Sequence, residues 1–373
     1  MRQLFAVISL LGTVANAQIG KFVPTGDMTR ARSAHRATLL ANGRVLITGG
    51  SGDDSAELYD PSTGTFRLTG HMTASRFGHA ATLLADGRVL ITAGNGLASA
   101  EIYDPVTEKF TATGAMLEDQ FNHAATLLPD GKVLIVGGER AAPPWPTAAR
   151  AELYDPATGT FSFAAPYAGP GSLYAAGGPV WPTAHLLPDG RVLILGENPA
   201  ELYDPASGTF SFTGAMVATS YRYGMEWHSS TLLRDGNVLI TGGNDDLTCG
   251  GFPVAEIYEA FSGRFKAIAP MTAARDIHTS TLLSDGTVLL TGGGEGWCGG
   301  ATLDSAEIYD PATQSFTAVG NMTHSRTLHT ATLLNDGTVL IAGGGAYWPA
   351  SVARSAEIYR PATSRTGRTR SVR

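Results

Sequence analysis

The sequence predicts an all-β protein, a seven-bladed β-propeller whose blades each contain four strands. Three observations support this prediction. First, the segment HAATLLADGRVLITAG at 79–94 recurs along the 373-residue chain at intervals of about 50 residues, a spacing typical of repeat architectures. Second, its apolar residues are consecutive rather than alternating, which indicates strands buried on both faces. Third, the strands at the two chain ends allow a ring to close. The copies begin at His35, His79, His123, Thr183, His228, His278 and His329.

Each copy predicts two strands and is followed by two more. In the copy at 79–94, Asp86-Gly87 separates two apolar runs, which is a strong hairpin signal. A pair of glycines usually ends the second run, consistent with close backbone packing or a positive φ angle. A third strand of the type AELYDP follows, then a Pro-x-Thr-Gly turn and a fourth strand such as TFRLTGHM at 65–72. Radial stacking of such four-stranded units describes a propeller.

The ends of the chain predict how the ring closes. The last copy has three strands, ending in AEIYRP at 356–361, and no fourth. Near the N-terminus, KFVPTGDM at 21–28 matches the fourth-strand pattern and has no preceding strands of its own. We therefore expect the N-terminal strand to complete the last blade of a single domain spanning 18–363. Closure of this kind leaves no free propeller edge.

The repeat resembles the kelch repeat. The resemblance rests on an R-x-x-H lead-in, an apolar strand, Gly-Gly and a later Tyr, and it covers nearly the whole chain after residue 17. Gln120 and Met225 replace the lead-in Arg in two copies, and Phe stands where kelch repeats usually carry an outer-strand Trp. The resemblance implies kelch-type blades but not a function, because kelch propellers serve as enzymes, adhesins and adaptors. The lead-in arginines are Arg32, Arg76, Arg275 and Arg326.

Residues 1–17 have the pattern of a secretory signal peptide. Arg2 precedes an apolar run at 4–14, and Ala-Asn-Ala ends at Ala17. We therefore expect a secreted or periplasmic protein cleaved after Ala17, with an uncleaved anchor as the alternative. No later stretch is long and apolar enough for a membrane span. The net charge of −7 argues against a nucleic-acid partner, and the Arg-rich tail at 364–373 is expected to be disordered.

The variable segments predict one functional face. Loops between second and third strands lie on the same face as the linkers between blades, and both vary, whereas the turns on the opposite face are short and nearly identical. Binding residues commonly lie on such loops, and exposed Trp and Tyr provide large contact areas. Packing of these aromatics within their own loops is the alternative. The predicted binding residues are Trp145, Trp181, Tyr221, Arg222, Tyr223, Glu226, Trp227, Asp245, Trp297, Tyr347 and Trp348.

The two cysteines, Cys249 and Cys298, lie at matching positions of adjacent blades on this same face. In an exported protein this placement predicts a disulfide bond. Long loops can bring the two Cα atoms within the roughly 7 Å that such a bond requires. Two free thiols or metal ligands are the alternatives.

Residues repeated in most blades are expected to be structural. Histidine occupies one position in six copies, and a wide ring of imidazoles differs from a metal site, which needs three or four convergent ligands. The glutamate that heads each third strand is also expected to belong to the scaffold, paired with the lead-in arginines or with the histidines. We expect no cofactor and no resident metal. Adjacent aspartates in the variable loops leave calcium binding as an alternative.

The sequence thus favours an exported recognition module, expected to be a monomer, that binds a glycan or a protein through the loop-rich face. The alternative is a carbohydrate-active enzyme using that face, a galactose-oxidase-like oxidase or a lyase. The resemblance to the oxidase would imply a copper-radical site with a Cys–Tyr cross-link, a second Tyr and two His. We find no residues onto which that site can be carried. A purely structural surface repeat protein is a third hypothesis.

Overall fold

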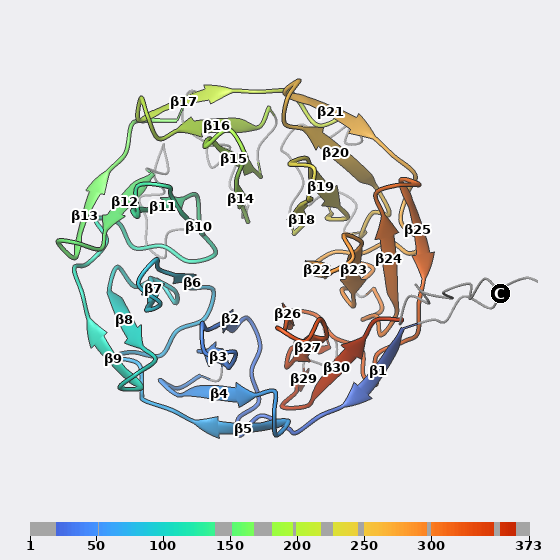
Figure 1. Ribbon diagram of the computed structural model, residues 1–373, viewed down its shortest axis with the longest axis horizontal. Helices are drawn as coiled ribbons and strands as arrows, with labels where there is room; N and C mark the ends of the chain where they lie inside the picture. Colours follow the sequence, from blue (N-terminus) through green and yellow to red (C-terminus); the bar gives the residue numbers. More distant parts are fainter. Residues whose placement is uncertain are drawn as a thin grey trace, which may run out of the picture.

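The computed structural model describes residues 20–50, 52–138, 151–167, 181–196, 199–217, 227–244, 250–296, 300–346 and 351–362. These residues form seven four-stranded antiparallel sheets arranged in a ring around a central axis (Figure 1). The predicted seven-bladed all-β propeller is therefore confirmed. The described residues contain no helix, and so none that could cross a membrane. The predicted signal peptide at 1–17 and the tail at 364–373 lie outside the described residues.

Each blade runs from an inner strand beside the axis to an outer strand at the periphery (Figure 1). Blades one to four contain β2 (Arg36–Leu39), β3 (Val45–Thr48), β4 (Ala56–Asp60) and β5 (Thr65–Leu68); β6 (Ala80–Leu83), β7 (Val89–Thr92), β8 (Ala100–Asp104) and β9 (Lys109–Ala112); β10 (Ala124–Leu127), β11 (Val133–Val136), β12 (Glu152–Asp155) and β13 (Thr160–Phe163); and β14 (Thr183–Leu186), β15 (Val192–Leu195), β16 (Glu201–Asp204) and β17 (Thr209–Phe212). Blades five to seven contain β18 (Ser229–Leu232), β19 (Val238–Thr241), β20 (Ala255–Glu259) and β21 (Arg264–Ala267); β22 (Thr279–Leu282), β23 (Val288–Thr291), β24 (Ala306–Asp310) and β25 (Ser315–Ala318); and β26 (Thr330–Leu333), β27 (Val339–Ala342), β30 (Ala356–Arg360) and β1 (Lys21–Pro24). A short hairpin of β28 (Gly345–Ala346) and β29 (Ser351–Val352) lies in the loop between β27 and β30.

The N-terminal strand closes the ring as predicted. Strand β1 pairs antiparallel with β30, and the paired residues run from Lys21 with Arg360 to Pro24 with Glu357 (Figure 1). Phe22 packs on Tyr359 with the ring centroids 5.0 Å apart. The last blade therefore contains residues from both ends of the propeller, and the N-terminal segment supplies its outer strand.

The hydrophobic core consists of layers between adjacent blades. The side chains of Val45 and Ile47 in β3 pack toward blade seven, whereas Leu46 between them packs toward blade two. All three are fully buried. A strand that faces a neighbouring sheet on both sides must be apolar at successive positions. This is the physical reason for the consecutive apolar residues in every copy of the repeat.

The lead-in arginines tie each linker to its own blade. Arg32 Nε donates a hydrogen bond to Glu57 Oε1 at 2.8 Å, and Arg32 Nη1 donates to the carbonyl oxygens of Gly49 and Ser55. Both partners of the Arg32–Glu57 ion pair are fully buried. The backbone N–H of Thr29 also donates to Glu57. The predicted scaffold role of the repeated glutamates is thus confirmed, and arginine is the partner in four of the blades. The other pairs are Arg76 with Glu101, Arg275 with Glu307, and Arg326 with Glu357.

Candidate functional site

The residues that lead into the seven inner strands form the rim of a cavity on the axis. The cavity has a volume of about 200 Å³ and lies at the end of the channel where the linkers between blades arrive. Six of the rim residues have left-handed φ angles between 47° and 60°. This conformation lets backbone N–H groups reach across blades, because Ala34 donates to the carbonyl of Leu328, Gly78 to that of Ala34, and Asn122 to that of Gly78. From blade one to blade seven, the rim residues are Ala34, Gly78, Asn122, Trp181, Trp227, Ile277 and Leu328.

Beneath the rim, the repeated histidines link neighbouring blades. His79 Nε2 lies 2.8 Å from Oγ1 of Thr48 in the preceding blade, and His123 makes the same contact with Thr92 at 2.8 Å. The predicted role of the histidines in hydrogen bonding is confirmed, but the bond joins two blades instead of staying within one. Burial lowers the pKa of His123 to about 3, so its imidazole is neutral at pH 7. The histidine ring therefore adds no positive charge to the cavity.

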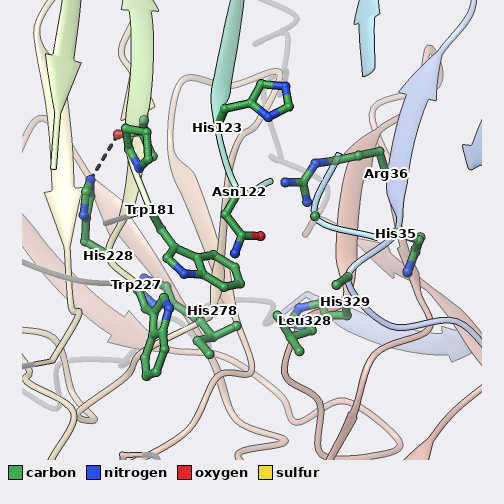
Figure 2. Close-up of a pocket in the computed structure, with 15 residues that line it drawn as sticks. His35, Arg36, Asn122, His123, Trp181, Trp227, His228, His278, Leu328 and His329 are labelled. Atoms are coloured by element: carbon green, nitrogen blue, oxygen red, sulfur yellow. Dashed lines mark hydrogen bonds between the residues drawn. The ribbon is translucent and has the colours of Figure 1, made fainter. Parts of the chain in front are cut away.

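Where a junction between blades lacks the threonine of the histidine–threonine pair, a second substitution at the same junction leaves no histidine without a partner. Strand β15 ends in Leu195, whereas β3, β7, β19 and β23 end in Thr. His228 instead contacts Thr183 of the inner strand at 3.0 Å (Figure 2). Strand β11 ends in Val136, and in the next blade Pro182 takes the place of the repeated histidine and requires no partner. Each junction thus keeps either a matched pair or no polar group. At the junction of blades seven and one, β27 ends in Ala342, and His35 instead contacts Thr330 of the inner strand.

Replacement of Thr48 by Val should destabilise the protein by about 1–3 kcal/mol. The substitution leaves His79 Nε2 buried without its partner, and an unpaired buried polar atom costs roughly that amount. Urea unfolding at pH 7 measures the change. Thr38→Val is the matched control, because no hydrogen bond of the Thr38 hydroxyl occurs within the described chain. Equal losses in both variants would contradict the proposed role of the blade-to-blade bond.

One wall of the cavity is aromatic and aliphatic. The rings of Trp181 and Trp227 lie in an edge-to-face arrangement with centroids 6.0 Å apart and an interplanar angle of 88°. Ile277 and Leu328 continue this wall around the rim. Figure 2 shows both indoles on the same side of the cavity, where each side chain is partly exposed. The wall therefore offers a continuous apolar surface to a molecule that enters from the loop-rich face.

The opposite wall carries a cation. Arg36 is the first residue of β2, and Figure 2 shows its guanidinium pointing toward the centre of the cavity, where Asn122 lies. Burial lowers the pKa of Arg36. Gly78 leaves room for the neighbouring amide, since a Cβ at that position would come within 2.5 Å of Asn122 Oδ1. The site thus combines one guanidinium, one amide and two indoles.

The structure brings together two of the predicted binding residues, Trp181 and Trp227, and adds two that sequence reasoning missed, Arg36 and Asn122. Comparison of the repeat copies could have found Arg36, because it is the only charged residue directly after the repeated histidine position. Asn122 is likewise the only uncharged polar residue at the rim position. The other predicted residues lie outside the described residues: Trp145, Tyr221, Arg222, Tyr223, Glu226, Asp245, Trp297, Tyr347, Trp348 and the cysteines Cys249 and Cys298.

The described residues of the cavity do not fit the copper-radical site that the resemblance to galactose oxidase implies. Neither Tyr nor Cys lines the described cavity. His35 and His329 use Nε2 to contact threonines, and their Nδ1 atoms are sealed from solvent. Within the described ranges, no group of three or more His, Cys, Asp or Glu side chains is placed to hold a metal ion. We therefore derive no chemical step through copper.

Comparisons with known proteins agree with the fold. The kelch motif family model matches residues 278–323. The solved structure of a protein described as a novel fungal alcohol oxidase of the AA5 family, in complex with copper, is similar to this chain with a TM-score of 0.75. The two sequences are 20% identical, and the match covers 92% of this chain and 76% of that one. No curated protein sequence matches the chain. At this identity the likeness concerns the fold, and it bears out the resemblance to kelch-repeat propellers.

Proposed function

We propose that this chain, a kelch-repeat β-propeller, is an exported recognition module that binds a glycan or protein ligand through its loop-rich face. The observation that carries the proposal is the pair of partly exposed indoles, Trp181 and Trp227, on one wall of an axial cavity that opens to that face. Indole rings provide large, rigid contact surfaces with little loss of conformational entropy. The rigid ring of blades holds both indoles in place before a ligand arrives, which favours affinity.

The test is a glycan-array screen with the purified protein, followed by calorimetric titration of the best ligand. Trp181→Ala and Trp227→Ala should each weaken binding by about tenfold or more, as expected for aromatic residues at the centre of a binding site. Phe261→Ala is the matched control, since Phe261 is a fully exposed aromatic in the turn between β20 and β21, on the opposite face. Cooperative unfolding of each variant verifies its fold. A ligand whose affinity is unchanged in both Trp variants would contradict the proposal.

An enzyme acting on carbohydrate through the same face is the second candidate. The similarity in shape to a copper-containing AA5 alcohol oxidase favours it, and the donor atoms of the described cavity argue against it. Incubation of the copper-loaded protein with galactose and with primary alcohols distinguishes the two candidates. Production of hydrogen peroxide would support an oxidase, whereas binding without turnover supports the recognition module.

A further inference from the structure

The cation in the axial cavity departs from the repeat. The six residues equivalent to Arg36 are small, and each lies at the same position of its inner strand next to the channel. Arg36 is therefore not part of the structure that the blades have in common, because the other six blades form with a small residue at this position. The equivalent residues are Ala80, Ala124, Thr183, Ser229, Thr279 and Thr330.

Arg36 has no counter-charge within the described part of the chain. No hydrogen bond or ion pair to its side chain occurs there, in contrast to the fully paired Arg32 only four residues earlier. The charge of Arg36 acts on the imidazoles of His35, His79 and His123, and burial lowers the pKa of each so that all three are neutral at pH 7. Arg36 is only partly exposed in the cavity, and an unpaired charge that is held largely away from water is costly for the folded state. Charged groups of this kind in a cavity are commonly retained for a ligand.

The balance of charge and shape defines the class of that ligand. A single guanidinium among uncharged groups pairs best with a ligand that carries one negative charge. The planar guanidinium can donate two parallel hydrogen bonds to the two oxygens of a carboxylate. In Figure 2 the Asn122 amide lies between the Arg36 guanidinium and the Trp181 indole, and both indoles lie on the other side of the cavity from Arg36. A sugar ring offers hydroxyl groups to the amide and C–H faces to the indoles. The volume of about 200 Å³ is below that of pockets for drug-sized ligands, which suits a single ring.

We propose that the axial cavity binds the carboxylate of an acidic sugar residue, with Arg36 holding the carboxylate and Trp181 and Trp227 contacting the ring. This inference rests on the proposed recognition function and names the ligand class of the same cavity. Arg36 then sets the preference for an acidic over a neutral sugar, whereas the indoles contribute to the binding of both.

The test is calorimetric titration with methyl glucuronide and methyl galacturonide, each compared with its neutral counterpart, methyl glucoside or methyl galactoside. The wild-type protein should bind at least one uronide about tenfold or more tightly than its neutral counterpart. Arg36→Gln should remove this preference, because it should weaken binding of the uronide far more than binding of the neutral sugar. Arg354→Gln is the charge-matched control and should keep the preference, because that side chain is 63% exposed.

A second readout separates a ligand-binding arginine from a structural one. Arg36→Gln removes an unpaired charge, so it should raise the Tm in the absence of ligand. A uronide concentration that saturates the wild type should raise the wild-type Tm by more than it raises the Tm of this variant. A lower Tm for Arg36→Gln in the absence of ligand would overturn the proposal by showing a structural role.

The remaining outcomes distinguish this inference from the proposed function. Equal affinity for uronide and neutral sugar, with binding still lost in Trp181→Ala, would overturn the inference and leave the recognition function intact. Uronide binding that is unaffected by Trp181→Ala and Trp227→Ala would overturn both. Equal or tighter binding of inorganic phosphate or of N-acetylglutamate amide would overturn the assignment of an acidic sugar.

Discussion

Acidification from pH 7 to pH 5 should lower the free energy of unfolding by several kcal/mol. Burial lowers the pKa of His35, His123 and His329 from 6.5 to about 3 in the folded protein. Below pH 6.5 the unfolded chain takes up protons on these rings while the folded chain does not, so stability is lost as the pH falls. At pH 5 each such imidazole accounts for about 2 kcal/mol.

The environment of the second ring nitrogen explains this effect. Nδ1 of each of these three histidines is sealed from solvent and has no hydrogen-bond partner among the described residues. A proton there would create a buried charge without a partner, which is unfavourable. Urea unfolding at pH 7, 6 and 5 measures the loss. His35→Gln cannot titrate, so it should lose about 2 kcal/mol less than the wild type between pH 7 and pH 5. Equal stability of the wild type at both pH values would contradict the prediction.

The fold was predictable because each copy of the repeat encodes both its local structure and its contacts with neighbours. Consecutive apolar residues such as Val45, Leu46 and Ile47 require a sheet on either side. The N-terminal strand was identifiable because it carries the contacts that outer strands share. Thr25 Oγ1 lies 3.0 Å from the hydroxyl of Tyr59 in blade one, which is the distance that joins Thr69 to Tyr103 in the next pair of blades.

The candidate site was only partly predictable, because it combines repeated and unrepeated features. Trp181 and Trp227 stood out by residue type, whereas Arg36 lies inside the segment that defines the repeat. Inner-strand side chains line the channel, and the scaffold requires only small residues there, so a single substitution places a charge on the axis. The long loops differ in length and sequence from copy to copy. Comparison of the copies therefore does not predict where Trp297 or Trp348 lies relative to the cavity.

Replacement of Glu57 by Gln should destabilise the propeller by about 3–5 kcal/mol, the loss expected when one partner of a buried ion pair is removed. Arg32 would keep its bonds to the carbonyl oxygens of Gly49 and Ser55, but its charge would remain buried without a carboxylate. The new amide group would also face the backbone N–H of Thr29, which now donates to a carboxylate oxygen. Urea unfolding at pH 7 measures the loss.

Blade three provides the matched control, because Glu152 occupies the same position without an arginine. Gln120 stands in the place of the lead-in Arg, and Glu152 accepts hydrogen bonds from the backbone N–H groups of Leu117 and Glu118. Burial raises the pKa of Glu152, so its ionised form already costs stability at neutral pH. Glu152→Gln removes that cost together with one acceptor, and the net change should be about 1 kcal/mol or less. If the two substitutions were equally damaging, the glutamate's bonds to the linker backbone, rather than its pairing with arginine, would be what holds each linker to its blade.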